Sequence, residues 1–430
     1  MPQRQFAGPA TGWRSRIPSG ALAAAVAHGL RMLVNLVVIK LISVAIGPAG
    51  LGAIGNLISV LTFIMVFAGG GVANGVVKYV AQHRDQPRVM LRFIESALAL
   101  GFSVSGVVFL VSLFAAEPIA RALFGTATLF WLSPVLGIAH LICFLGTATI
   151  AIANGNQRSD IFAAISIIAY VGCIPVAYLL IERFGFTGSA MALMAMTGCT
   201  GIPALWVALR SPLRRAVKLR FHRTEMHMLL RFSVMAFASA AAFPLAEILI
   251  RTALTSKLGL VDAGIWQASI RLSGAILGFY TVFLATSYMP RLSALTDPKA
   301  SLRFVHVSLL RTAGAFAILA LGVYLSRSLV VPLLFSKEFR TLEPLLAWQL
   351  LGDLFRVSAY VVAFFFIARA QLWLHIGAEI VQYTIYACVS LAIVHSGGDL
   401  SAVVQGYAIS YAIYLTIGIT WLHTRGLQLK

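Results

Sequence analysis

Long apolar stretches recur along the chain, and short polar segments separate them. About 20 mostly apolar residues in a helix cross the roughly 30 Å hydrocarbon core of a bilayer. Because an open strand would leave backbone groups unpaired in lipid, each stretch of that length is predicted to be a helix. Twelve are predicted, at about residues 21–46, 52–79, 89–114, 128–153, 161–181, 187–209, 229–255, 263–289, 301–327, 344–368, 371–395 and 401–423.

The composition favours a fold class that is all-α and integral to a membrane. The chain is 60% hydrophobic and only 11% charged, with a mean hydropathy of +0.90, whereas a soluble domain carries roughly 25% charged residues. The cysteines lie singly in apolar runs, without a CxxC motif or a Cys/His cluster. Neither a disulfide framework nor a metal site is therefore predicted.

The basic residues indicate how the chain is oriented. Its formal net charge is +19, but the cations are spread over short loops, which is typical of membrane topology and not of a face that binds nucleic acid. The N-tail, the C-tail and the loops after even-numbered stretches carry most of them, including a dense run at 210–231. The positive-inside rule then predicts a multi-pass protein with both termini in the cytoplasm.

The two halves of the chain share features at a near-constant offset. Gly52 recurs as Gly264, and Leu-Phe at 123–124 recurs at 334–335. An even number of helices per half gives both halves the same orientation, so the axis that relates them runs along the membrane normal, with a substrate path between them. The predicted division is a cytoplasmic N-tail (1–20), a six-helix bundle (21–209), a basic cytoplasmic connector (210–228) and a second six-helix bundle (229–430).

No motif for self-contained catalysis is present. The segment from Gly50 to Gly55 matches GxGxxG, but it follows a spanning helix rather than a strand, so we interpret it as a helix-start turn that permits close packing. The sequence has no P-loop, HExxH or GxSxG motif. A transporter without catalytic residues is predicted, not an enzyme.

Ionisable groups inside the first predicted span are candidates for a substrate path. A charged side chain costs about 2.5–3.5 kcal/mol at the centre of a spanning helix, so it usually faces a cavity or a partner. Arg31 lies roughly 15 Å into the helix at about 1.5 Å per residue, and Asn35 shares its face one turn later. Lys40 lies on the opposite side and closer to the outer end, where its long side chain can reach the interface.

The second half contains further charged groups within its spans. Glu247 and Arg251 are spaced i, i+4, and Asp353 and Arg356 are spaced i, i+3. Each set is either a self-neutralising pair on its own helix or part of a cavity.

One further polar face lies on the eleventh span, where Glu379 is flanked by His375 and Gln382. It would relay a proton or hold a cation, or it makes simple hydrogen bonds between helices. Arg271 and Arg311 have no acid at helical spacing on their own helices.

Cations outnumber anions within the spans. Because guanidinium binds phosphate bidentately and stays charged when desolvated, this surplus favours an anionic substrate. A proton-coupled exporter of organic cations would instead show a surplus of carboxylates. The cations are Arg31, Lys40, Arg251, Arg271, Arg311 and Arg356, and the anions are Glu95, Glu247, Asp353 and Glu379.

Blocks in both halves resemble the Wzx family of polysaccharide flippases, which belongs to the multidrug/oligosaccharidyl-lipid/polysaccharide (MOP) superfamily. The similarity covers essentially all twelve spans. The blocks are Gly47-Pro48-Ala49-Gly50-Leu51-Gly52, Gly75-Val76-Val77-Lys78-Tyr79-Val80-Ala81-Gln82, Gly264-Ile265-Trp266-Gln267, Ala347-Trp348-Gln349-Leu350-Leu351-Gly352-Asp353 and Ala378-Glu379-Ile380-Val381-Gln382.

The resemblance implies the V-shaped MOP transporter fold, with two six-helix bundles around a central cavity. It implies that an undecaprenyl-pyrophosphate-linked oligosaccharide (an O-antigen, lipid III or exopolysaccharide repeat unit) moves from the cytoplasmic to the periplasmic leaflet of the bacterial inner membrane by alternating access. Polysaccharide polymerase and chain-length proteins are implied as partners. No cofactor is implied, although proton or sodium coupling is expected.

The resemblance also matches charged positions of those flippases to residues of this chain, but Arg271 and Arg311 fall outside the shared pattern. The predicted cations that bind the pyrophosphate are Arg31, Lys40, Arg251 and Arg356. The predicted coupling or polar cavity residues are Asn35, Asp353, Glu379 and Gln382.

Two alternatives remain open at this point. A cation-coupled multidrug exporter of the same superfamily would show cationic-drug resistance without a glycan phenotype. A membrane-embedded glycosyltransferase or polymerase would carry acids on a large periplasmic loop, whereas the predicted outer loops are all short.

Overall fold

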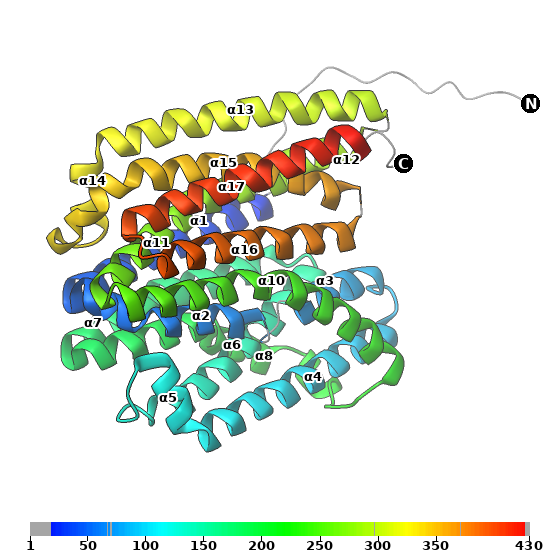
Figure 1. Ribbon diagram of the computed structural model, residues 1–430. Helices are drawn as coiled ribbons and strands as arrows, with labels where there is room; N and C mark the ends of the chain where they lie inside the picture. Colours follow the sequence, from blue (N-terminus) through cyan, green and yellow to red (C-terminus); the bar gives the residue numbers. More distant parts are fainter. Residues whose placement is uncertain (1–18, 67, 69–70, 296, 370, 426–430) are drawn as a thin grey trace, which may run out of the picture.

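Helices make up every regular element of the described chain in a computed structural model, which covers residues 19–425 apart from 67, 69–70, 296 and 370 (Figure 1). The predicted N-tail therefore falls almost entirely outside the described residues. In the first half the helices are α1 (Ser19–Ala53), α2 (Gly55–Met65), α3 (Gly71–Gln82), α4 (Pro87–Phe114), α5 (Ala116–Phe124), α6 (Leu132–Gly155), α7 (Ser159–Gly198), α8 (Gly201–Arg210) and α9 (Leu213–Ala216).

The second half continues the all-helical pattern. Its elements are α10 (Arg223–Lys257), α11 (Leu260–Phe283), a π-helix η2 (Leu284–Tyr288), α12 (Met289–Ser293), α13 (Pro298–Leu325), α14 (Arg327–Leu334), a 3-10 helix η3 (Lys337–Thr341), α15 (Leu342–Ala368), α16 (Leu372–His395) and α17 (Leu400–Arg425).

The prediction of twelve spanning helices is confirmed, although two spans are joined and one is divided. By length and composition, nine helical stretches among the described residues are able to cross a membrane. One of these, Ser159–Arg210, contains a left-handed backbone at Gly185 (φ 50°) and supplies both the fifth and the sixth predicted spans. The second predicted span is divided into α2 and α3, and α10 occupies the seventh, beginning at Arg223 rather than near 229.

Apolar side chains cover the outside of the bundle, as a lipid-facing surface requires. Phe114 is 83% exposed, Ile318 is 76% exposed and Leu310 is 71% exposed. Such a surface would associate in water, because contiguous exposed apolar patches mark contact with another apolar phase. The chain is a multi-pass membrane protein.

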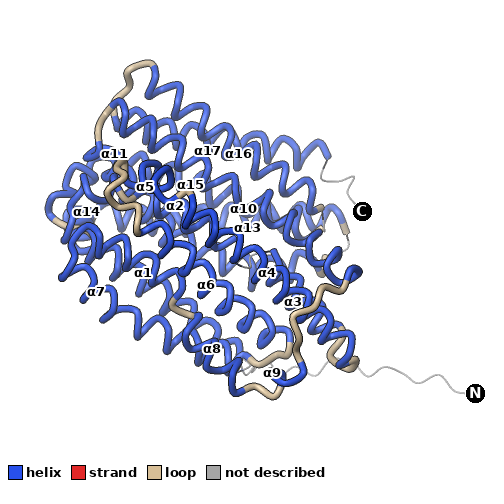
Figure 2. Tube along the Cα trace, turned by 90° about the horizontal axis from the view of Figure 1, so that it is seen from below, coloured by secondary structure: helices blue, strands red, loops and turns tan. Residues whose placement is uncertain are grey.

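The helices of each half lie together, and the halves meet along a few helices. In Figure 1 the second-half helices α13, α15, α16 and α17 lie above the first-half helices α4, α6 and α8. Contacts between the halves are made chiefly by α1 with α11 and by α10 with α2 and α3. Figure 2 shows the same helices from below, with short loops at their ends.

The structure repeats itself as the sequence offset predicts. The short helices α5 and α14 follow equivalent long helices, α4 and α13, and lie at the same end of the molecule (Figure 1). We call this end the α5/α14 end, and the opposite end, which carries residues 211–222 and the last turn of α17, the basic end.

Gly52 and Gly264, the first repeated pair, touch each other across the two halves. A methyl group on Gly52 would collide with the carbonyl oxygen of Leu260, and one on Gly264 would collide with that of Pro48. The contact is reciprocal, because 48 and 260 are separated by the same offset as 52 and 264. Equivalent residues meet in this way only close to a two-fold axis, and only glycine permits backbones to approach so closely.

Glu95 attaches the connector to the first half. Its Oε1 accepts a hydrogen bond from the backbone N–H of Lys218 at 2.9 Å, and its Oε2 lies 2.7 Å from Nε2 of His222. The backbone N–H of His222 also donates to Oγ of Ser96 at 3.2 Å. Glu95, one of the predicted intramembrane acids, therefore attaches the basic segment to the first third of α4, and it does not line the cavity described below.

Candidate functional site

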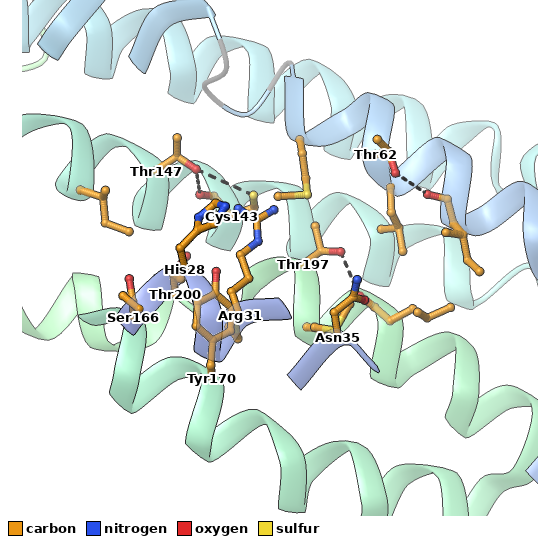
Figure 3. A pocket seen from close by; sticks show the side chains of 18 of the residues that line it. His28, Arg31, Asn35, Thr62, Cys143, Thr147, Ser166, Tyr170, Thr197 and Thr200 are labelled. Atoms are coloured by element: carbon orange, nitrogen blue, oxygen red, sulfur yellow. Dashed lines mark hydrogen bonds between the residues drawn. The ribbon is translucent and has the colours of Figure 1, made fainter. Parts of the chain in front are cut away.

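The main cavity, of about 480 Å³, lies inside the first half and reaches the second half at one residue, Arg271. It lies nearer the basic end, because it is lined by the early part of α1, the last part of α6 and the first part of α7 (Figure 3). Its polar lining residues are His28, Arg31, Asn35, Thr62, Thr147, Ser166, Tyr170, Thr197, Thr200 and Arg271.

Helical periodicity on α1 explains the most polar wall of this cavity. His28, Arg31 and Asn35 recur at spacings of three and four residues, which place them on one face of a helix. All three line the cavity, and Figure 3 shows the Arg31 side chain beside His28 and Tyr170. The predicted shared face of Arg31 and Asn35 is therefore present.

The electrostatic character of the main cavity is cationic. Arg31 from the first half and Arg271 from the second half both line it, and none of the described lining residues is an aspartate or a glutamate. A side cavity of about 300 Å³ between α1 and α11 shares these two arginines with the main cavity. Two guanidinium groups in a space walled by helices attract an anion.

Arg271 forms one long ion pair with the protein. Its Nη2 lies 3.8 Å from Oε2 of Glu247, a buried carboxylate on α10. Among the described residues, its Nε and Nη2 have no hydrogen-bond partner. Both of these atoms are buried, whereas the side chain as a whole is 21% exposed and lines the cavity. Arg271 is absent from the predicted phosphate-binding cations because it falls outside the pattern shared with the flippases. The acid that faces it, Glu247, comes from another helix.

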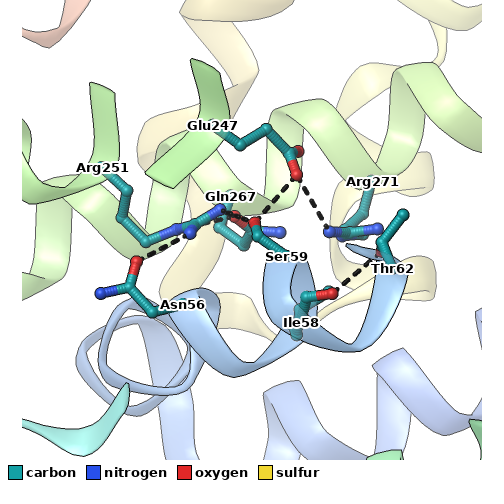
Figure 4. A network of polar contacts seen from close by, with 8 residues as sticks. All are labelled: Asn56, Ile58, Ser59, Thr62, Glu247, Arg251, Gln267 and Arg271. Carbon is teal, nitrogen blue, oxygen red and sulfur yellow. Dashed lines mark hydrogen bonds and ion pairs between the residues drawn. The ribbon is translucent and has the colours of Figure 1, made fainter. Parts of the chain in front are cut away.

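Arg251 lies behind the cavity wall and connects the halves. Its Nη1 donates to Oδ1 of Asn56 at 3.0 Å, its Nη2 donates to Oγ of Ser59 at 3.1 Å, and its Nε donates to Oε1 of Gln267 at 3.1 Å. The guanidinium carbon also lies 5.4 Å from the ring centroid of Trp266. We call Asn56, Ser59, Glu247, Arg251, Gln267 and Arg271 the interhalf network (Figure 4).

Lys40 lies outside the cavity, at the α5/α14 end. Its Nζ donates to the backbone carbonyl of Pro332 at 2.6 Å and to that of Phe335. Free carbonyls at a helix C-terminus carry partial negative charge, so an ammonium group is stabilised there. Lys40 thus joins α1 to the end of α14, on the side of α1 away from Arg31.

Asp353 and Arg356 lie in the core of the second half and are joined through a tyrosine. The Asp353 oxygens accept hydrogen bonds from Tyr407 Oη and Ser273 Oγ, both at 2.6 Å. Arg356 donates to Tyr360 Oη at 2.9 Å and to Tyr407 Oη at 3.3 Å. Both side chains are buried, and neither lines the two cavities that contain Arg31.

The residues of the predicted polar face on α16 also do not line those cavities. Glu379 Oε1 lies 3.7 Å from Nε2 of His375, and Gln382 donates to Tyr411 Oη at 3.0 Å. Gln382 is buried and makes a hydrogen bond between helices. Of the predicted site residues, Arg31 and Asn35 line the cavity. The others do not line it, namely Lys40, Arg251, Asp353, Arg356, Glu379 and Gln382.

Comparison with known proteins places the chain in a family. A family described as "Polysaccharide biosynthesis protein" matches residues 18–296. The chain belongs to this family. It is also 31% identical over 390 residues to the lipid III flippase of Escherichia coli (strain K12), which covers 89% of this chain and 92% of that protein.

Solved structures of low sequence identity confirm the fold of this family member. The inward-facing conformation of a multidrug resistance MATE family transporter of the MOP superfamily has a TM-score of 0.77 at 14% identity, covering 95% of this chain and 98% of that one. An outward-facing conformation has a TM-score of 0.69 at 16% identity, covering 95% and 96%. The expected MOP fold and the assignment as a transporter rather than an enzyme are confirmed.

Proposed function

We propose that this member of the family moves an undecaprenyl-pyrophosphate-linked oligosaccharide from the cytoplasmic to the periplasmic leaflet of a bacterial inner membrane. Family membership and the similarity to a lipid III flippase support the substrate class. The observation that carries the proposal is the pair of arginines, one from each half, in a cavity whose described lining contains no acid.

The pyrophosphate is the part of this substrate that needs the arginines. Carrying a doubly charged group into the membrane without counter-charge is strongly unfavourable. In our proposal Arg31 and Arg271 bind the phosphate oxygens, since planar guanidinium groups donate two parallel hydrogen bonds to phosphate. The hydroxyl groups of Thr147, Ser166 and Thr200 offer neutral hydrogen bonds to the sugar, and the lipid tail stays in the bilayer.

The other predicted cations take a different part in this proposal. Lys40, Arg251 and Arg356 already bind protein acceptors and do not line the main cavity. We therefore assign them to contacts within and between the halves. Asp353 and Glu379 are the proposed sites at which a proton or a sodium ion resets the carrier.

The position of the contact between Gly52 and Gly264 supports alternating access. Gly52 and Gly264 bring the halves together at the α5/α14 end, whereas the cavity lies nearer the basic end. If the basic end lies in the cytoplasm, as the positive-inside rule predicts, a cavity nearer that end supports a cytoplasm-facing state. The halves, 21–209 and 229–430, would rock about the bound pyrophosphate.

The structural similarity to MATE transporters suggests one alternative function, a cation-coupled drug exporter. A cavity with two arginines and no acid among its described lining residues repels organic cations, so this alternative is disfavoured. It predicts drug sensitivity, without a glycan defect, when the protein is depleted.

Depletion of the protein in cells, followed by analysis of lipid-linked intermediates, tests the proposal. We expect a completed oligosaccharide-lipid to accumulate on the cytoplasmic leaflet. Complementation by Arg31→Ala or Arg271→Ala should fail at normal membrane levels, because each loses charge-assisted hydrogen bonds to phosphate. Arg311→Ala is the matched control, since Arg311 lies in a separate groove between α11 and α13. Normal glycan export by both cavity variants would refute the proposed phosphate site.

A further inference from the structure

The interhalf network contains two guanidinium groups and a single carboxylate, Glu247, which pairs with Arg271. Glu247 is fully buried, and Arg251 is 1% exposed. Glu247 Oε2 accepts a hydrogen bond from Ser59 Oγ at 2.9 Å and forms the 3.8 Å ion pair with Arg271. With two cations and one carboxylate, the network carries a net positive charge. A bound anion would neutralise this charge.

Arg251 obtains two of its three acceptors, Asn56 and Ser59, from the opposite half. Glu247 and Arg251 are spaced i, i+4 on α10, a spacing at which an ion pair forms readily on one helix. The structure shows a different arrangement, in which Glu247 faces Arg271 while Arg251 donates to Asn56 and Ser59 of α2. Figure 4 shows these contacts meeting at Ser59, between α2 and the second-half helices.

This arrangement makes the contact between the halves depend on the partner of Glu247. While Glu247 pairs with Arg271, separation of the halves would take Asn56 and Ser59 away from the buried Arg251 and leave it only the neutral acceptor Gln267 among the described residues, which is unfavourable. If an anion in the cavity occupies Arg271, Glu247 is released to pair with Arg251 on the same helix. The bonds from Arg251 to Asn56 and Ser59 are then dispensable, and the halves can separate at the α5/α14 end.

We propose that Glu247 is a positioning residue that exchanges partners, from Arg271 in the empty cavity to Arg251 when an anion is bound, and so allows the halves to part only with substrate in place. The inference rests on the proposed function, because it takes the phosphate groups of the substrate as the anion. A free carboxyl oxygen on Glu247 and free donors on Arg271 support the exchange, since Oε1 of Glu247 and Nε of Arg271 have no hydrogen-bond partner among the described residues.

The test uses the purified full chain, with inorganic pyrophosphate as the probe. Its native cysteines are replaced, and spin labels are placed at Thr128→Cys in the first half and Ser328→Cys in the second, both exposed near the α5/α14 end. Pyrophosphate binding is measured separately by calorimetry. We expect pyrophosphate to lengthen the label-to-label distance in the unaltered chain. In Glu247→Gln, binding should persist, and tighten by about tenfold because the competing carboxylate is lost, but the distance should no longer respond.

Two further variants keep the test decisive. Asn56→Ala removes an acceptor of Arg251 without touching the cavity charges, and it should give a longer distance without pyrophosphate. Glu182→Gln alters an exposed carboxylate on α7, outside the network, and should respond like the unaltered chain. An equal response in Glu247→Gln and the unaltered chain, or binding without any lengthening in the unaltered chain, overturns the partner exchange. Failure of pyrophosphate to bind at all would instead overturn the proposed function.

Discussion

Four arginines in the transmembrane region differ in what surrounds their guanidinium groups. Arg251 and Arg356 donate to protein oxygens on several helices. Arg31 and Arg271 line the cavity. A buried guanidinium that already has its acceptors gains little from a ligand, because binding one would break existing hydrogen bonds. The ability to bind an anion therefore depends on the partners of each side chain rather than on the number of arginines.

The hydroxyl group of Tyr407 is predicted to stabilise the folded protein. Its Oη donates to Asp353 and accepts from Arg356, and it is the described atom that joins the two charges. We expect Tyr407→Phe to lower the free energy of unfolding by about 1–3 kcal/mol, because it leaves a buried carboxylate oxygen without its donor. Thermal unfolding in detergent, followed by tryptophan fluorescence, measures the change.

The neighbouring Tyr386 provides the control for this prediction. Its hydroxyl group makes no hydrogen bond to Asp353 or to another carboxylate among the described residues, and its ring packs against that of Tyr407 at 5.3 Å between centroids. Tyr386→Phe should therefore leave the unfolding temperature close to that of the unaltered chain. Equal losses in both variants would mean that the Tyr407 hydroxyl does not support Asp353.

The placement of a site residue was predictable from the sequence where it depends only on spacing along one helix. The spacing of Arg31 and Asn35 predicts their shared face, and the position of Lys40 predicts its separation from Arg31. The partner of Arg271 was not predictable, because Glu247 reaches it from another helix, and side-chain spacing along one helix contains no information on contacts between helices. For the same reason, Arg251 was predicted as a cavity residue although Asn56 and Ser59 bind it behind the cavity wall.

At the scale of helices, the crossing of α1 and α11 depends on glycine. Even alanine at position 264 would place its methyl group against the carbonyl oxygen of Pro48. We expect Gly264→Ala to force the halves apart at the α5/α14 end, because backbone cannot yield as a flexible side chain does. Distance measurements between spin labels at positions 128 and 328 should then show a longer population without any ligand.

Gly314 on α13 is the matched control for this helix contact. No heavy atom lies within 4 Å of a methyl group built there, so Gly314→Ala should leave the distance distribution unchanged. A distribution in Gly264→Ala that matches the unaltered chain would show that the crossing tolerates a methyl group, and that the reciprocal contact does not hold the α5/α14 end closed.

Long helices were predictable from the sequence, and short ones were not. A run of about 20 apolar residues identifies a spanning helix whatever its neighbours. By contrast, α5 and α14 contain 9 and 8 residues and are too short for that signal, so they appeared only as outer loops. The fifth and sixth predicted spans were divided at the correct place within α7. The left-handed Gly185 that makes this turn could not be distinguished from other glycines in the sequence.

For the whole molecule, the repeat within the sequence has a direct structural counterpart. Equivalent glycines meet at the closed end, equivalent short helices lie beside them, and the two cavity arginines come from different halves. Any rocking of the halves must therefore change the separation of Arg31 and Arg271. A substrate with two linked phosphates is suited to such a site, because one group bridges both arginines.

Transport by purified protein in liposomes tests the central claim most directly. The liposomes contain an undecaprenyl-pyrophosphate-linked oligosaccharide, and a membrane-impermeant glycan-modifying enzyme reports how much of it reaches the opposite leaflet. We predict transfer by the unaltered chain, and a loss of at least about tenfold in the Arg31→Ala, Arg271→Ala double variant, as expected when charge-assisted hydrogen bonds worth about 1.5–3 kcal/mol each are removed. No transfer by the unaltered chain, or equal transfer by the double variant, would contradict the account.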